Sequence, residues 1–135
     1  MLGATLPVFA KSRSIPLDAL YATAYALVQA QRFADAACVF RAMLKAAPTD
    51  ERAWVGLGEC HERVGQPHLA LEIFGAGSLA ARPSVRCTLA RARVLRALGQ
   101  SATLEETLEE ARTLAALIES DELRRLVEQA AEAWS

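Results

Sequence analysis

Three side chains of the kinds that bind metal ions lie close together in the sequence: Cys60, His61 and His68. Thiolate sulfur and imidazole nitrogen are common zinc ligands. Consecutive residues of a helix point about 100° apart, so Cys60 and His61 would not face the same ion. The chain also lacks the His-x-x-x-His and Cys-x-x-Cys spacings that accompany such sites. We therefore expect no metal site here.

Catalytic chemistry has no clear candidate residues. The sequence shows no Ser/His/Asp or Cys/His arrangement, no glycine-rich phosphate loop and no isolated pair of carboxylates. With 135 residues the chain is expected to form one domain, which leaves no room for a separate catalytic domain. These observations predict a protein that is not an enzyme, with no catalytic residues and no cofactor.

The charge balance argues against two classes of partner. A formal net charge of −1 gives no bulk attraction to nucleic acid or to an anionic membrane surface. No apolar run approaches the roughly 20 residues that span a bilayer. A basic stretch could contact nucleic acid, but we expect its arginines to pair with the glutamates of residues 105–110 and 119–132. These arginines are Arg82, Arg86, Arg91, Arg93 and Arg96. We therefore expect protein partners, no nucleic acid and no membrane insertion.

The cysteines and the first residues predict the compartment. Cys38, Cys60 and Cys87 are odd in number and widely spaced, which is typical of reduced, mostly buried thiols. In the first 14 residues the positive charges follow a short apolar stretch, whereas a secretory signal has its charges first and a longer apolar core. Both observations predict a cytoplasmic protein.

The elements that would position any site follow a repeat of about 34 residues. Positions that coincide on this shift are Phe33 with Pro67, Ala36 with Ala70, Phe40 with Phe74 and, one shift later, Gly65 with Gly99. The second copy also has the pattern W-x-x-L-G…A-x-x-x-F, which begins at Trp54 and ends at Phe74. Period and pattern together resemble the tetratricopeptide repeat.

This repeat predicts an all-α fold of three tandem tetratricopeptide helix-turn-helix repeats and a C-terminal capping helix, arranged as a concave right-handed superhelix. We expect a flexible N-terminal arm over residues 1–16 and the repeat domain over residues 17–135. The repeats are expected at about 17–50, 51–84 and 85–118, and the capping helix at about 121–134. Its apolar face would be formed by Leu123, Leu126, Val127, Ala130 and Trp134.

Several residues predict local structure. Residues 48–50 supply N-cap candidates for the next helix, and Thr103 to Glu106 read as a T-x-x-E capping box. Gly75 and Gly77 indicate close approach of a neighbouring helix, or local irregularity. Small residues are expected where paired helices cross, at Ala36, Gly58 and Ala70. Large apolar residues are expected in the core, at Phe40, Trp54, Leu57 and Phe74.

The first helix of each repeat is expected to line the concave face. Its second, fifth, ninth and twelfth positions give an apolar stripe bordered by arginines and glutamates, which favours an apolar or amphipathic segment of a partner protein. The expected peptide-binding residues are Tyr21, Tyr25, Val28, Arg52, Val55, Glu59, Arg86, Leu89 and Arg93. His61 is expected to border this surface. The N-terminal arm or a second copy of the chain is the alternative occupant.

A more specific resemblance rests on four stretches of sequence. They are Leu20-Tyr21 with Tyr25, Phe33-Ala34-Asp35-Ala36, Gly56-Leu57-Gly58-Glu59-Cys60, and Val64-Gly65-Gln66 with Leu69-Ala70. Over about residues 17–118 the chain resembles the class II type III secretion chaperones, the translocator chaperones of Gram-negative bacteria.

This resemblance implies a cytoplasmic bacterial chaperone that holds an apolar segment of a hydrophobic translocator in its groove before export. The client would be a secreted translocator, or a tip or needle-type protein, and a homodimer is among the assemblies implied. Tyr21 and Tyr25 match aromatic positions that receive the client, whereas Val28 replaces an aromatic residue common there. The alternative function is that of a tetratricopeptide scaffold module in another bacterial assembly.

Overall fold

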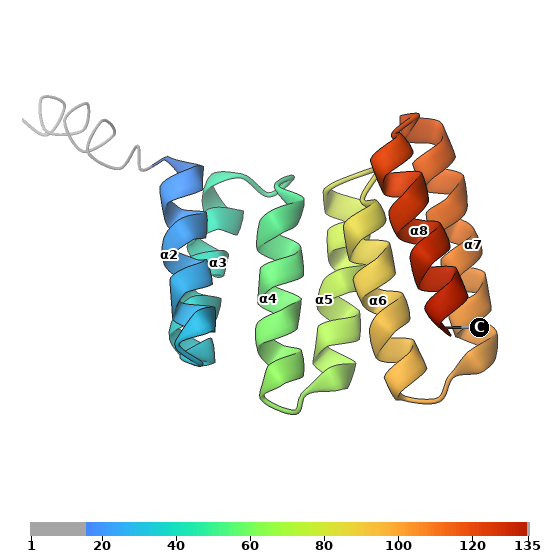
Figure 1. Ribbon diagram of the computed structural model, residues 1–135. Helices are drawn as coiled ribbons and strands as arrows, with labels where there is room; N and C mark the ends of the chain where they lie inside the picture. The colour runs from blue at the N-terminus through green and yellow to red at the C-terminus, as the bar shows by residue number, and fades with distance from the viewer. Residues whose placement is uncertain (1–15, 135) are drawn as a thin grey trace, which may run out of the picture.

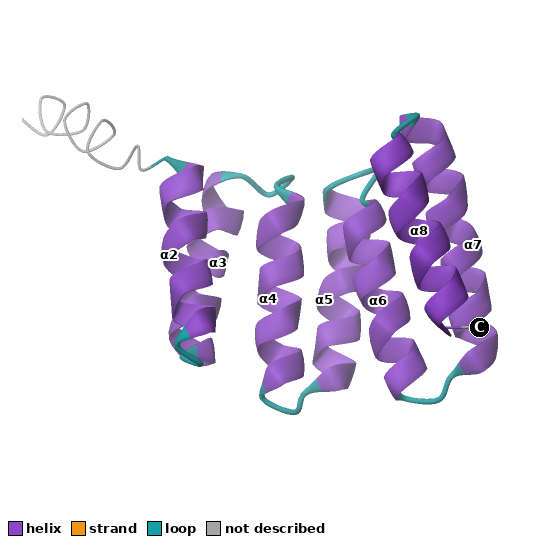
Figure 2. Ribbon diagram, viewed as in Figure 1, coloured by secondary structure: helices purple, strands orange, loops and turns teal. Residues whose placement is uncertain are grey.

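The computed structural model describes residues 16–134, which form seven helices and no strand (Figures 1 and 2). The expected arm lies outside the described residues, apart from Pro16. The helices are α2 (Leu17–Gln29), α3 (Phe33–Ala46), α4 (Glu51–Arg63), α5 (Pro67–Ala80), α6 (Val85–Ala97), α7 (Ser101–Ile118) and α8 (Asp121–Trp134). The predicted all-α repeat fold is confirmed.

The 34-residue period is visible in the backbone of the turns. Gln31, Gly65 and Gly99 lie one period apart, and all three have positive φ, at 60°, 82° and 73°. In each turn this residue and the next donate their backbone N–H groups to carbonyls near the end of the preceding helix. Such a left-handed residue closes a helix and reverses the chain. Glycine adopts this conformation without strain, so Gln31 is the exception among the three turns.

Side chains cap α4, α6 and α8 but not α7; at α8 the Ser120 hydroxyl accepts a hydrogen bond from the Leu123 N–H at 3.2 Å. The Asp50 carboxylate accepts a hydrogen bond from the Arg52 backbone N–H at 3.1 Å, and the Ser84 hydroxyl accepts one from the Cys87 N–H at 3.2 Å. The prediction of a capping box at Thr103 is wrong. Because the turn at Gly99 closes α6 early, α7 begins at Ser101 and Thr103 already lies inside the helix. An N-cap residue needs non-helical dihedral angles, which Thr103 does not have there.

The helices form two layers. Each helix packs against the next one along the chain, and α2, α4, α6 and α8 also contact one another in sequence. Among the described helices, α3, α5 and α7 make no such contacts with each other. Since the first set is closely spaced and the second is spread apart, the array curves with α2, α4, α6 and α8 on its inner side. We call these helices the inner layer.

Glycines allow the layers to pack closely. A Cβ atom at Gly58 would overlap the ring of Phe74, and one at Gly56 would overlap the ring of Phe40. At Gly77 a Cβ would lie 2.6 Å from Trp54 Cβ and 2.8 Å from Cys87 Sγ. The close approach predicted at Gly77 is therefore confirmed. A Cβ at Gly75 would meet nothing within 4 Å, so the close approach predicted there is wrong.

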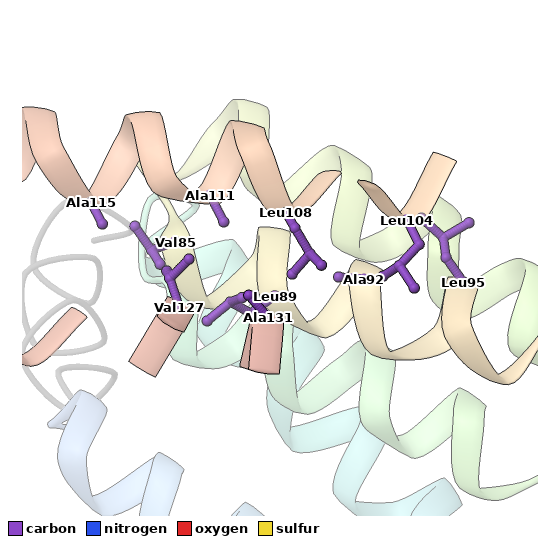
Figure 3. Close-up of a cluster of buried hydrophobic side chains, with 10 residues drawn as sticks. All are labelled: Val85, Leu89, Ala92, Leu95, Leu104, Leu108, Ala111, Ala115, Val127 and Ala131. Atoms are coloured by element: carbon purple, nitrogen blue, oxygen red, sulfur yellow. The ribbon is translucent and has the colours of Figure 1, made fainter. Parts of the chain in front are cut away.

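The core runs along the whole array, and its largest cluster joins α6, α7 and α8 (Figure 3). Its side chains point toward one another from the three helices and include Val85, Leu89, Leu108 and Val127. Phe40, Leu57 and Phe74 are buried as predicted. Trp54 differs from the prediction because it is only half-buried, and its indole N–H donates to the Pro48 carbonyl at 2.8 Å.

Candidate peptide-binding groove

A cavity of about 240 Å³ lies between α2, α4 and the start of α6 on the inner layer. We call it the tyrosine cavity. It is lined by Tyr21, Tyr25, Val28, Phe40, Glu51, Arg52, Val55, Gly56, Glu59 and Arg86. Seven of the nine predicted binding residues are in this list. The helical spacing of Tyr21, Tyr25 and Val28 explains this, since residues three and four apart share one helix face.

The aromatic rings of this cavity contact one another. The ring centroids of Tyr21 and Tyr25 are 5.8 Å apart, and those of Tyr21 and Phe40 are 6.5 Å apart, both in tilted arrangements. Tilted pairs at these distances are favourable beyond their buried area. Tyr21 is half-buried, whereas Tyr25 keeps 48% of its surface exposed. Tyr25 therefore offers a large apolar ring to a ligand.

Arg52 connects the helix cap to the tyrosines. Its guanidinium lies 4.9 Å from the centroid of the Tyr21 ring and donates to Asp50 Oδ2 at 2.9 Å and to Asp18 Oδ1 at 2.8 Å. The hydrogen bond from the Arg52 side chain lowers the pKa of the Asp50 carboxyl. A cation held over a ring by two carboxylates restricts both side chains. The Tyr21 side of the cavity is thus fixed before any ligand binds.

A second cavity, of about 420 Å³, lies between α4, α6 and α8. We call it the tryptophan cavity. It is lined by Val55, Glu59, Arg86, Leu89, Ala90, Arg93, Leu126, Gln129, Ala130, Ala133 and Trp134. Leu89 is only 7% exposed, because α8 covers it.

The sequence did not predict that α8 contributes to the binding surface, although it lines one side of the tryptophan cavity. The apolar face of α8 was predicted, including Leu126, Ala130 and Trp134, but only as cover for the exposed flank of the last repeat. In the structure Val127 and Ala131 provide that cover in the core, while Leu126, Ala130 and Trp134 also line the cavity. The apolar face of α8 is wider than the core requires, and this width could have indicated that α8 also lines a cavity.

The two cavities adjoin, because Val55, Glu59 and Arg86 line both of them. We call the combined surface the groove. It contains all nine predicted binding residues, from three helices of the inner layer.

The arginines of the groove are held by carboxylates. Arg86 lies 3.4 Å from Glu51 Oε1 and 3.3 Å from Glu122 Oε1, and Arg93 lies 2.6 Å from Glu62 Oε1. The expectation that the basic stretch pairs with downstream glutamates holds for Arg86, and also for Arg91, which contacts Glu110 at 2.7 Å. It is wrong for Arg93, whose partner belongs to the preceding repeat.

Glu59 differs from the other charged residues of the groove. Among the described residues, no side chain makes an ion pair or hydrogen bond with its carboxylate. Partial burial raises the pKa of Glu59, and the nearby charge of Arg93 opposes this rise. The groove therefore contains one carboxylate that is poorly solvated and unpaired.

His61 does not border the groove, contrary to expectation. It lines a different cavity, between α3 and α4, where Nδ1 lies 2.7 Å from Gln66 Oε1 and Nε2 lies 3.4 Å from an Arg41 nitrogen. Burial raises the pKa of the neighbouring Cys60 thiol to about 11, which disfavours the thiolate. No three His, Cys, Asp or Glu side chains within residues 16–134 are placed to share a metal ion. Over the same residues, no helix is both long and apolar enough to cross a membrane.

Comparison with known proteins identifies related sequences. The family model described as tetratricopeptide repeat matches residues 27–94. The low calcium response locus protein H of Yersinia pestis is 30% identical over 106 residues, which cover 78% of this chain and 63% of that relative. The chain thus spans less than two thirds of the length of this relative.

Solved structures of type III secretion chaperones have a fold similar to that of this chain. The type III secretion translocator chaperone SycD of Yersinia enterocolitica matches with a TM-score of 0.77 and 28% identity, over 87% of each chain. A crystal structure of SycD in complex with a peptide of the translocator YopD matches with a TM-score of 0.73 and 28% identity, over 86% of this chain and 87% of that one.

Proposed function

The chain belongs to the tetratricopeptide-repeat family, and on this premise we propose that it is a cytoplasmic chaperone of a bacterial type III secretion system. In this proposal it binds an apolar segment of a secreted translocator, or of a tip or needle-type subunit, in the groove. Binding keeps the client soluble before export. The protein acts by binding alone and is not an enzyme.

The observation that carries this proposal is the groove on the inner layer of this fold. SycD, which shares the fold, has been crystallised with a translocator peptide. In this chain the inner layer presents an exposed tyrosine at one end and a tryptophan cavity at the other. Aromatic side chains supply a large contact area for little loss of side-chain entropy.

The size of the groove suits reversible binding. Burial of about 400 Å² of apolar surface would contribute roughly 10 kcal/mol before any costs, at ~25 cal/mol per Å². Loss of free motion and ordering of an extended segment offset much of this gain. We therefore expect micromolar affinity, which protects an aggregation-prone segment and still allows release at the secretion machinery.

The cysteines support a reducing compartment. Cys38, Cys60 and Cys87 are all free thiols, and two of them are buried. Burial raises the pKa values of Cys60 and Cys87 to about 11, so both are poor nucleophiles. These residues fit a structural role in the cytoplasm better than a disulfide framework or a redox site.

The test is a pull-down from lysate of the source bacterium followed by mass spectrometry. The baits are the wild type, Tyr25→Glu and the matched control Tyr25→Phe. We expect Tyr25→Glu to fold normally, because the side chain is half exposed, and to lose the client, because it places an unpaired charge in an apolar site. Tyr25→Phe should keep it.

The identity of the captured protein decides between the two functions. Recovery of a secreted protein with long apolar segments by wild type and Tyr25→Phe, but not by Tyr25→Glu, supports the chaperone. Equal recovery with all three baits, or capture of a folded complex alone, favours the scaffold function and removes the groove as the binding site.

A further inference from the structure

We propose that Glu59 recognises a basic side chain of the client, so that the bound segment carries a lysine or arginine between two apolar anchor residues. This inference rests on the proposed function and specifies the chemistry of the client at the same groove.

Glu59 lies where three cavities meet. It lines the tyrosine cavity and the tryptophan cavity, and also a third cavity of about 290 Å³ that it shares with Glu62, Arg63 and Arg93. A segment with one apolar side chain beside Tyr25 and another beside Trp134 must therefore pass over Glu59. The residue of the client between these anchors would face the Glu59 carboxylate.

The arginines around Glu59 all have other contacts. Arg86 contacts Glu51 and Glu122, Arg93 contacts Glu62 at 2.6 Å, and Arg52 contacts Asp18 and Asp50. Arg63 lies 4.9 Å from the centroid of the Phe33 ring. Within the described part of the chain, none of these arginines forms an ion pair with the Glu59 carboxylate.

A bound segment would change the surroundings of Glu59. In the unbound chain the Glu59 side chain is only partly buried, and this partial burial already raises its pKa. A client that covers the groove would bury the carboxylate further, and a buried carboxylate without a partner is strongly unfavourable. A backbone N–H of the client could fill one lone pair, but only an ammonium or guanidinium group also balances the charge. A basic side chain between apolar anchors meets both needs.

Synthetic peptides with the same apolar anchors and different central residues test this recognition. The probes are short peptides in which two leucines flank a central lysine, norleucine or glutamate, prepared with several leucine spacings. Norleucine has the length and apolar character of the lysine side chain without its charge. Affinities are measured by calorimetry for wild type, Tyr25→Glu, Glu59→Gln and the control Glu105→Gln. This control changes an exposed glutamate of α7, which lies outside the inner layer.

We expect wild type to bind the lysine peptide about tenfold more tightly than the norleucine peptide, and the glutamate peptide least well. Glu59→Gln should reduce the preference for lysine to nearly none, while Glu105→Gln keeps it. Because Glu59→Gln removes an unpaired charge, it should fold at least as well as wild type, which thermal unfolding checks.

Two contrary results have different meanings. Binding that is lost in Tyr25→Glu but is indifferent to the central residue would overturn the role of Glu59 and leave the proposed function in place. Absence of binding for every peptide and spacing, in every variant, would overturn both.

Discussion

Arg52 contacts both the cap of helix α4 and a tyrosine of the groove. It holds the carboxylate that caps α4 and at the same time covers the ring of Tyr21. A single side chain therefore couples the start of an inner-layer helix to the orientation of a candidate binding residue. Damage to the cap should therefore affect both stability and the shape of the tyrosine cavity.

The Asp50 cap leads to a prediction about stability and pH. Asp50→Ala should lower the free energy of unfolding by about 1 kcal/mol at neutral pH, since the α4 backbone loses its cap. Because the hydrogen bond from Arg52 lowers the pKa of Asp50 in the folded state, its contribution is complete above the unfolded pKa and is lost as the pH falls through the folded one. Urea unfolding at neutral and acidic pH should show the deficit shrink in acid.

The uncharged variant Asp50→Asn serves as the control for this experiment. Its side-chain oxygen can still accept from the Arg52 N–H, so most of the cap should survive. Equal stability of Asp50→Ala and wild type at neutral pH would show that the cap contributes nothing.

Replacement of Gln31 by glycine should stabilise the protein. Gln31 has a φ of 60° at the turn position where the later repeats have Gly65 and Gly99. A non-glycine residue in this conformation is strained by about 1–2 kcal/mol, part of which is offset by the entropy that glycine loses on folding. Gln31→Gly should therefore raise the free energy of unfolding by up to about 1 kcal/mol, and with it the melting temperature. Gln31→Ala should show no such gain. A lower melting temperature for Gln31→Gly would contradict the left-handed conformation of residue 31.

The helices are the scale at which the sequence was most informative. Pro16 lies directly before α2, Pro67 begins α5, and Gly65 and Gly99 lie in the turns that close α4 and α6. These signals are local, which is why they can be read from the sequence. The prediction of a capping box at Thr103 was wrong because α7 begins at Ser101, directly after the turn at Gly99.

Contacts between repeats were harder to predict. The partner of Arg93 is Glu62 of the preceding repeat, and this choice depends on how closely α4 and α6 approach. The contribution of Trp134 to a cavity likewise depends on the angle at which α8 docks on α6. Helical periodicity gives the face of a helix but not its docking angle, so the tyrosine side of the groove was predicted and the α8 side was missed.

Helix α8 should have two separable roles. Trp134 lines the tryptophan cavity, whereas Val127 is 1% exposed in the core below it. Trp134→Ala should weaken client binding about tenfold through the loss of a large aromatic contact, with little loss of stability at the end of the helix. Val127→Ala should instead lower the free energy of unfolding by about 2 kcal/mol and leave affinity nearly unchanged.

Titration of the captured client into both variants, together with thermal unfolding, separates these effects. Loss of stability but not of affinity in Trp134→Ala would mean that α8 only covers the last repeat.

The whole molecule is a curved array with one face suited to a peptide. Its inner layer carries Tyr21, Tyr25, Trp134 and the unpaired carboxylate of Glu59, and its core extends from α2 to α8. A curved surface built from short repeats can contact an extended segment along its length. This arrangement explains how the proposed chaperone could protect a long apolar client.

Site-specific photocrosslinking in the source bacterium can show whether the groove holds a secreted client. A photoreactive phenylalanine analogue would replace Val28, which lines the tyrosine cavity. The control would replace Leu79 of α5, which is 67% exposed and belongs to the other layer. We expect position 28 to crosslink to a secreted protein through an apolar segment and position 79 not to do so. Crosslinking of the same protein from position 79 alone, or of a folded complex from position 28, would contradict this expectation.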